Sequence, residues 1–302
     1  MRRGAAPGET VRLVAELGGA RQQLGDTAGA VRAFERAQAL LPESAGVAAA
    51  LAQAHLQAGQ YEQAIRVAQA GRERAADDTG LVRIEAIAGV RAGRAAEAMA
   101  MAERALGPRQ TTPEAAFALA DIYQEAKRYD AAVALVSALA ATAPDDDQFA
   151  FRLGAAYESA GRIAEAEIAF RGIVARDPLH ANALNYLGYM LANRGVRLTE
   201  ALGFIDRALV IEPGNPAFLD SQGWALLKLG RAADAEAPLR TAADALRGSS
   251  VIQSHFAEVL AAMGKRAEAV ERLERALAGD GVDVDRAALE SRLRQLGGHK
   301  TP

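Results

Sequence analysis

The chain has 302 residues and a net charge of −3 at pH 7; 50% of its residues are hydrophobic, but only 5% are aromatic. This charge balance disfavours a nucleic-acid-binding surface, which needs a basic stripe. The lack of cysteine excludes disulfides, thiolate metal sites and a cysteine nucleophile. No apolar run approaches transmembrane length, and the N-terminal residues lack the hydrophobic segment of a signal peptide.

A turn residue recurs along the chain at intervals of 34 residues, with one interval of 35. The eight positions are Gly25, Gly59, Gly93, Lys127, Gly161, Gly195, Gly230 and Gly264. An alanine follows each of them five residues later, or six after Gly195, and a small side chain there lets two helices approach closely. Because glycine readily adopts the left-handed conformation that ends a helix, each period predicts two antiparallel helices joined by a tight turn. A repeat of this length is typical of an α-solenoid.

The repeat phase divides the chain into eight predicted helix pairs followed by one further helix. The repeats are expected at residues 11–44, 45–78, 79–112, 113–146, 147–180, 181–215, 216–249 and 250–281. Residues 1–10 are expected to be disordered and residues 297–302 to form a frayed tail. A capping helix is expected at residues 282–296, with Asp283 or Asp285 as its N-cap, to cover the last repeat.

The second and third repeats depart from the pattern. Gly71, Glu85 and Gly89 occupy positions where apolar or small helix-forming residues are usual, so we expect these repeats to be the softest part of the array. His55 falls on a core stripe and is expected to be a packed helix residue. Pro238 lies inside a helical pattern, which predicts a late helix start or a mild kink.

The segment from Leu153 to Phe170, which reads LGAAYESAGRIAEAEIAF, resembles the tetratricopeptide repeat family, and its relatives extend this resemblance over nearly the whole chain. The resemblance implies an all-α fold, a right-handed solenoid whose first helix in each pair lines a concave groove. Residues 182–277 also resemble a subgroup of bacterial tetratricopeptide proteins that are often envelope-associated lipoproteins. Some of that subgroup are adaptors that present client proteins to a partner such as a processing protease.

The sequence shows no constellation typical of an enzyme. Its histidines, which are His55, His180, His255 and His299, are scattered and form no metal-ligand spacing such as HExxH. There is no GxSxG, no phosphate-binding loop and no GxGxxG, and the aspartates at 145–147 fit helix caps. We therefore predict no catalytic residue, no metal site and no cofactor.

Helical geometry at roughly 100° per residue predicts which side chains face the groove. In the sixth repeat, Leu184, Leu187 and Leu191 share the core stripe, and the polar residues lie nearly opposite. The same construction in the seventh repeat places a tryptophan opposite the core. The predicted groove residues are Asn182, Asn185, Tyr189, Asn193, Asp220, Trp224 and Lys228. Asparagine amides can bond any peptide backbone, and aromatic side chains are typical binding anchors.

A structural alternative to the groove remains open, in which the asparagines are simply solvated and the two aromatic residues pack between helices. Four further residues lie sparsely on equivalent faces upstream and would extend the groove: Arg83, Arg91, Phe151 and Glu158. The residues do not reproduce the lysine-rich carboxylate clamp of chaperone-binding family members, so a chaperone tail is not the expected ligand.

These patterns predict a non-catalytic scaffold or adaptor that binds a protein or peptide segment in its groove. Two alternatives stay open, a regulatory sensor that binds a small molecule in the groove and a non-catalytic region of a larger enzyme assembly. Arginine outnumbers lysine by 31 to 4, a bias typical of GC-rich bacterial genomes. The bacterial cytoplasm and periplasm both remain open as compartments, and so does homo-oligomerisation.

Overall fold

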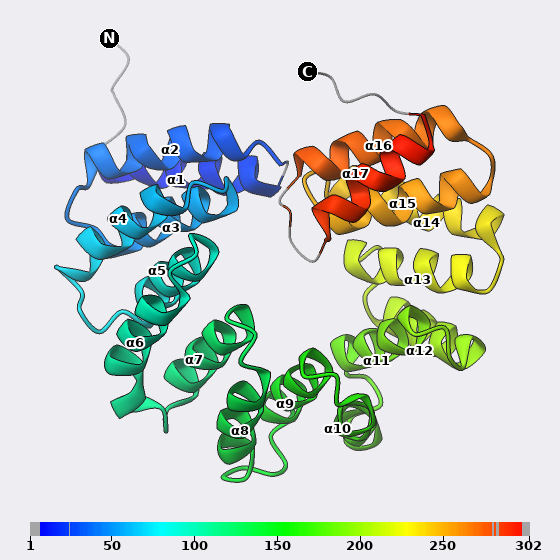
Figure 1. The fold of residues 1–302 in the computed structure, drawn as a ribbon, viewed down its shortest axis with the longest axis horizontal. Coiled ribbons are helices and arrows are strands. Elements are labelled where there is room, and N and C mark those ends of the chain that lie inside the picture. The colour runs from blue at the N-terminus through cyan, green and yellow to red at the C-terminus, as the bar shows by residue number, and fades with distance from the viewer. Residues whose placement is uncertain (1–6, 24, 280, 282–283, 298–302) are drawn as a thin grey trace. The chain divides into compact units, whose positions relative to one another are not determined.

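A computed structural model describes residues 7–23, 25–279, 281 and 284–297 of the chain. These residues form α-helices, one short 3-10 turn and no strand, so the predicted all-α fold of stacked helix pairs is confirmed (Figure 1). The contacts between helices separate the chain into two compact units, named unit 1 and unit 2, and the boundary falls between residues 169 and 170.

The helices follow the repeat phase closely. Unit 1 contains α1 (Pro7–Gln23), α2 (Thr27–Leu40), α3 (Ala45–Gln57), α4 (Tyr61–Arg72), α5 (Thr79–Arg91), α6 (Ala95–Leu106), the 3-10 turn η1 (Gly107–Arg109), α7 (Pro113–Glu125), α8 (Tyr129–Ala140) and α9 (Asp147–Ser159). Helix α10 (Ile163–Arg176) spans the boundary. Unit 2 contains α11 (Ala181–Asn193), α12 (Leu198–Ile211), α13 (Pro216–Lys228), α14 (Ala232–Ala245), α15 (Ser250–Ala262), α16 (Arg266–Ala278) and α17 (Arg286–Gln295).

Odd-numbered helices form one layer in each unit. Helices α3, α5, α7 and α9 pack against one another in sequence, as do α11, α13 and α15. The even-numbered helices α4, α6, α8, α12, α14 and α16 each pack against both of their neighbours along the chain. We call the odd-numbered helices the inner layer, and their surface away from the even-numbered helices the inner face. Residues on the inner face therefore meet residues of the next repeat, about one repeat length away in the sequence.

Turn chemistry explains the period. All eight predicted turn residues have positive φ. One of them, Lys127, adopts φ 58° although it has a side chain and lacks the conformational freedom of glycine. The one interval of 35 residues has an extra residue in the turn between α11 and α12. In that turn Arg197, the N-cap of α12, also adopts a left-handed conformation (φ 47°). Left-handed backbone costs a residue with a Cβ roughly 1–2 kcal/mol. The turn at Lys127 is therefore strained relative to its glycine equivalents.

Small residues let the two helices of a pair approach. The eight repeating alanines are all buried, which confirms the close approach predicted for them. Gly188 and Gly223, on the first helix of their pairs, face the second helix where these alanines lie. A Cβ at Gly188 would lie 2.6 Å from the carbonyl oxygen of Ala201, and one at Gly223 would lie 2.4 Å from Cγ of Leu239. Enlarging Gly188 would press on the backbone of the paired helix, and enlarging Gly223 would displace the side chain of Leu239.

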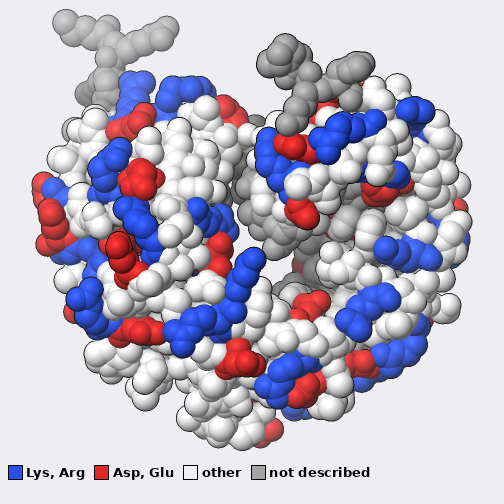
Figure 2. Space-filling model, in the orientation of Figure 1, with Lys and Arg blue, Asp and Glu red and all other residues white. Residues whose placement is uncertain are grey.

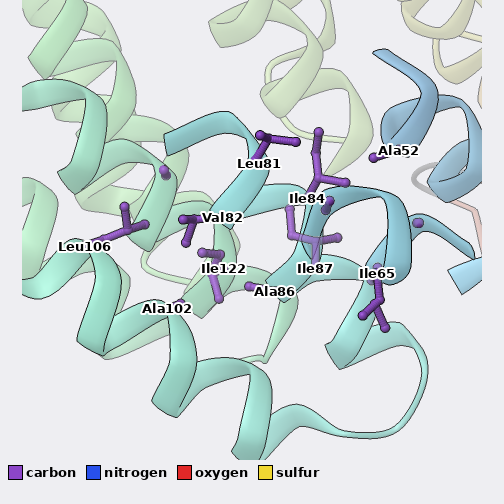
Figure 3. Close-up of a cluster of buried hydrophobic side chains, with 14 of the residues drawn as sticks. Ala52, Ile65, Leu81, Val82, Ile84, Ala86, Ile87, Ala102, Leu106 and Ile122 are labelled. Carbon is purple, nitrogen blue, oxygen red and sulfur yellow. The ribbon is translucent and has the colours of Figure 1, made fainter. Parts of the chain in front are cut away.

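The core is a series of small apolar clusters between successive helices. The largest in unit 1 joins α3 to α7, and Figure 3 shows where side chains such as Val82, Leu106 and Ile122 converge from α5, α6 and α7. On the face of the molecule in Figure 2, acidic and basic side chains are intermixed without a basic stripe. None of the described helices has the length and apolar character needed to span a membrane.

The unusual residues of the second and third repeats have specific partners. Glu85 is 8% exposed, and its carboxylate accepts hydrogen bonds from Gln69 Nε2 at 2.9 Å and from Arg72 Nη1 at 2.5 Å. Gly71 leaves room for the side chain of Leu81, since a Cβ at Gly71 would lie 2.9 Å from Cδ1 of Leu81. A carboxylate in a core position still replaces apolar packing, so the softness of these repeats stays a prediction. His55 is buried, as expected, and its Nδ1 lies 2.6 Å from Gln60 Oε1.

Three local expectations need correction or restriction. Helix α1 begins at Pro7, so residues 7–10 are helical where disorder was expected, because proline is well suited to a first helical turn. Helix α14 begins at Ala232 and continues through Pro238, so a late helix start is wrong. The rest of the expected N-terminal disorder, at residues 1–6, lies outside the described residues, as do Asp283 and residues 298–302 of the tail.

The capping helix is present. Asp285 is its N-cap and accepts hydrogen bonds from the backbone nitrogens of Ala287 and Ala288. Leu289, Leu293 and Leu296 lie on one side of α17 and pack against a cluster that includes Leu273. The last apolar surface of the repeats is therefore covered by this helix.

Candidate partner-binding site

All seven predicted groove residues lie on α11 and α13, two adjacent helices of the inner layer of unit 2. Each helix has a side-chain cap that fixes its start. His180 accepts a hydrogen bond from the backbone nitrogen of Ala183 at 3.1 Å, and Asn215 accepts one from Ala217 at 3.0 Å. These caps satisfy otherwise unpaired helix N–H groups and set the phase of each helix.

Helix α11 has the two sides that its sequence predicted. Its three stripe leucines are buried. Asn182 and Asn193 are exposed, whereas Asn185 and Tyr189 are partly exposed, and these four residues recur at helical spacing. Among the described residues, the side-chain oxygen of Asn185 is buried without a hydrogen-bond partner. A buried acceptor in this state costs roughly 1–3 kcal/mol, so it is a place where an added N–H donor is favourable.

Trp224 joins three helices of the inner layer. From α13, its ring stacks on His255 of α15 with a centroid distance of 4.1 Å and an interplanar angle of 18°. Its Nε1 donates a hydrogen bond to Asn193 Oδ1, at the end of α11, over 3.3 Å. Lys228, one turn further along α13, places its Nζ over the ring at 4.3 Å from the centroid. The tryptophan is partly exposed and nevertheless fixed in orientation.

Asp220 differs from its prediction as an open groove residue. It is only 6% exposed, and both of its carboxylate oxygens lie 3.0 Å from His255 Nδ1. Since a carboxylate can only accept, Nδ1 carries the hydrogen and donates it. Asp220 therefore pairs with His255 and not with Lys228. A helical wheel of α13 alone could not show this, because the next inner helix supplies the residue that covers the carboxylate.

Sequence reasoning missed His255, which is the centre of this arrangement. It is 7% exposed and contacts Trp224 and Asp220, and its ring centroid lies 6.2 Å from that of Tyr189. The signal that could have found it is spacing. His255 follows Asp220 by 35 residues and Trp224 by 31, and Trp224 follows Asn193 by 31. Polar and aromatic residues separated by about one repeat meet on adjacent inner helices.

The charged residues at the end of this layer are paired. Glu258 of α15 accepts two hydrogen bonds from Arg292 of α17, each at 2.8 Å. A two-pronged guanidinium–carboxylate contact of this kind is the strongest common geometry for an ion pair. Lys228 is not part of such an ion pair: among the described residues, no carboxylate pairs with its ammonium group.

The inner layer of unit 1 contains the upstream residues suggested as a groove extension. Arg83 and Arg152 lie 3.8 and 3.3 Å from the carboxylate of Asp121. Arg91 forms two hydrogen bonds with Glu125, at 3.0 and 2.9 Å. Burial raises the pKa of the Asp121 carboxyl, and the charges of Arg152 and Arg83 oppose that rise. The other two upstream candidates, Phe151 and Glu158, lie on α9.

The described residues contain no group of three or more histidine, aspartate or glutamate side chains placed to hold a metal ion. Two pockets, of about 270 and about 500 Å³, are lined by residues of unit 1. The candidate site in unit 2 is instead an open face of amide, aromatic and ammonium groups. Such a face suits recognition of an extended ligand by hydrogen bonds and flat apolar contact.

Comparisons with known proteins agree with this architecture. Tetratricopeptide repeat models match residues 22–84, 90–150 and 151–216. The TPR repeat-containing protein PA4667 of Pseudomonas aeruginosa is 40% identical over 99 residues, which are 33% of this chain and 17% of that protein. The matched region thus spans about a sixth of that relative's length.

Two solved structures have similar folds. A thermophilic TPR protein of Thermus thermophilus, TTC0263, has a TM-score of 0.52 and 25% identity, with 60% of this chain and 96% of that chain covered. A tetratricopeptide repeat protein of Parabacteroides merdae has a TM-score of 0.52 and 12% identity, with 96% of this chain and 100% of that chain covered. The second similarity concerns the fold alone.

Proposed function

Since this chain belongs to the tetratricopeptide repeat family, whose repeats generally serve as protein-interaction modules, we propose that it is a non-catalytic adaptor. It binds a segment of a partner protein on the inner face of unit 2. The resemblance of residues 182–277 to envelope-associated adaptors, noted from the sequence, supports the same role.

The observation that carries this proposal is the position of Trp224. A tryptophan held in place by three neighbours and still partly exposed is a typical anchor for a binding partner, because its large flat area is ordered before the partner arrives. The asparagines beside it supply donors and acceptors that a peptide backbone of any sequence can use.

Site-specific photo-crosslinking tests this proposal. A photoreactive residue is placed at Asn182 or Asn193, both exposed on the inner face, and as a matched control at Val210 of α12, which is 81% exposed. In cells of the native host, we expect the first two positions to capture a protein that Val210 does not capture. Mass spectrometry identifies the captured protein and the crosslinked segment.

A second variant in the same experiment decides whether the capture is specific. Adding Trp224→Ala to either crosslinking variant should remove the captured protein while the far-ultraviolet circular dichroism stays helical. Capture that persists without Trp224, or that is equal at Val210, contradicts a binding site on this face.

A further inference from the structure

Two side chains lie over the Trp224 ring before any ligand binds. His255 stacks on one face at a centroid distance of 4.1 Å, which leaves no space there for another group. Lys228 holds its ammonium over the ring at 4.3 Å from the centroid. A ligand that stacks on the ring where Lys228 lies must therefore displace that side chain.

The two covers differ in how firmly they are held. The side chains of His255 and Asp220 are 9% and 8% exposed, and they are hydrogen-bonded to each other. Lys228 is exposed and reaches the ring through a flexible four-carbon stem. A cation over an aromatic ring is held only weakly in an exposed setting. Lys228 is thus the movable cover, and His255 is the fixed support.

The charges of this face indicate what displaces Lys228. The carboxylate of Asp220 is occupied by His255, and that of Glu258 by Arg292, so neither is available to the lysine. Among the described residues, Lys228 has no carboxylate partner of its own. A carboxylate brought by a ligand would meet an unpaired ammonium, and the attraction would draw that ammonium away from the ring.

We propose that this face recognises a peptide segment in which an acidic side chain adjoins an aromatic or large aliphatic one. The acidic group forms an ion pair with the ammonium of Lys228. The apolar side chain then packs on the part of the Trp224 ring that Lys228 has left. The inference rests on the proposed function, since it names the class of segment that the same site binds. Lys228 is then the residue that determines specificity, because the ring opens fully only for a ligand that carries the acid.

Asn193 fits the same arrangement. Its side-chain oxygen already accepts the hydrogen bond from Trp224 Nε1, and its amide NH₂ remains a donor at an exposed position. A peptide carbonyl beside the apolar side chain can accept from that NH₂. The amide of Asn193, the ring face of Trp224 and the ammonium of Lys228 together contact one backbone group and two side chains of the ligand.

A random peptide library displayed on phage and selected on the full chain tests the proposal without a known partner. Selections run in parallel on the wild type and on Trp224→Ala, and only peptides that need Trp224 are retained. We expect the retained peptides to be enriched in aspartate or glutamate next to phenylalanine, tyrosine, tryptophan or leucine. Retained peptides without an acidic residue would overturn the proposal and leave the proposed function intact. A selection that yields no Trp224-dependent peptide contradicts both.

The selected peptide then gives a double-mutant cycle that isolates Lys228. Replacing its acidic residue by the neutral amide should weaken binding to the wild type about tenfold, and should change binding to Lys228→Met less than about twofold. Lys228→Arg serves as the control that keeps the charge, and it should retain the preference for the acid. Equal losses of affinity on the wild type and on Lys228→Met would show that another residue binds the acidic group. That result would reject the role of Lys228.

The emission of Trp224, the only tryptophan in the sequence, gives an independent readout in the same samples. Binding of the acidic peptide should shift the emission to the blue, because an apolar side chain replaces an ammonium and water above the ring. An acidic peptide that binds without changing this emission does not occupy the ring face, and that result also overturns the proposal.

Discussion

The inner layers of the two units use their polar residues differently. In unit 1, Asp121 pairs with Arg83 and Arg152, and Glu125 pairs with Arg91, so charges on α5, α7 and α9 are satisfied by the next repeat. These contacts connect neighbouring repeats across the surface of the layer. Since their side chains are partly exposed, each pair contributes about 0–1 kcal/mol to stability.

In unit 2, the same positions carry amide, aromatic and ammonium groups. Asp220 and His255 form a buried pair beneath Trp224, and Lys228 and the asparagines keep hydrogen-bonding capacity toward solvent. The comparison suggests that an inner face satisfied by its own ion pairs supports repeat stacking, whereas one that keeps spare donors, acceptors and aromatic area is available for a partner.

Removing the buried histidine should have the largest effect. His255→Ala leaves the carboxylate of Asp220 buried without its donor and should lower the free energy of unfolding by about 3 kcal/mol. Denaturant unfolding followed by circular dichroism measures the loss. The unit 1 counterpart Arg152→Ala breaks an exposed pair and should cost less than about 1 kcal/mol. Similar losses for the two variants would remove the distinction between buried support and surface pairing.

Trp224→Ala should weaken partner or selected-peptide binding by about 2 kcal/mol, the scale of an aromatic anchor. Its cost to folding should stay below the roughly 3–5 kcal/mol expected for a core tryptophan, because the ring is partly exposed. Isothermal titration and thermal unfolding measure the two quantities. Arg152→Ala is again the control and should leave binding unchanged. A large loss of stability with normal binding by the folded fraction would make Trp224 a packing residue only.

The third repeat should open more easily than the seventh. Glu85 and Gly89 line the pocket of about 270 Å³, and most other repeats have leucine or phenylalanine at the position of Glu85, so local packing is reduced. Outside the termini, amide exchange should be fastest between residues 71 and 112, about tenfold faster than between residues 216 and 249, which corresponds to about 1.4 kcal/mol of opening free energy. Uniform protection of amides from exchange across the repeats would contradict this expectation. It would mean that the hydrogen bonds of Glu85 with Gln69 and Arg72 stabilise the third repeat as much as apolar packing would.

Lys127→Gly should stabilise the protein by about 1 kcal/mol, because the lysine adopts φ 58° in a turn that is otherwise built with glycine. The melting temperature measures the gain. Gly161→Ala, at the equivalent turn of the next repeat, introduces the same strain and should lose a similar amount. If both variants are neutral, the turns do not contribute to the difference in stability between repeats.

The smallest effect concerns Asp121 and pH. Burial raises the pKa of its carboxyl in the folded state, so the proton binds more tightly to the folded protein than to the unfolded chain. This contribution to stability is fully present below the unfolded pKa and is lost as pH rises through the folded pKa. Unfolding free energies of the wild type minus those of Asp121→Asn should therefore decline as the pH rises above the ordinary aspartate pKa of about 3.9. A difference that rises with pH would mean that Arg152 and Arg83 dominate.

Much of the fold could be predicted because its determinants are local. The 34-residue phase, the turn residues and the buried alanines all follow from helix spacing and from the conformational freedom of glycine. Asp285 was foreseen as a cap for the same reason, since a cap bonds nitrogens only two and three residues away. The late helix start considered for Pro238 was wrong, because a helix can tolerate an interior proline when tertiary packing outweighs the lost hydrogen bond.

The candidate site was predicted only in outline. The helical wheel found the polar side of α11 and the position of Trp224, because both depend on the angle between residues of one helix. It placed Asp220 in the open groove and gave no role to His255, although these two residues form a buried pair. Whether a side chain is covered, and by what, depends on the next repeat, whose distance and orientation arise from packing between helices. Helix spacing is therefore enough to group the residues that share a helix face. Packing between repeats decides which of those residues are buried supports, which side chain covers Trp224 and which remain open.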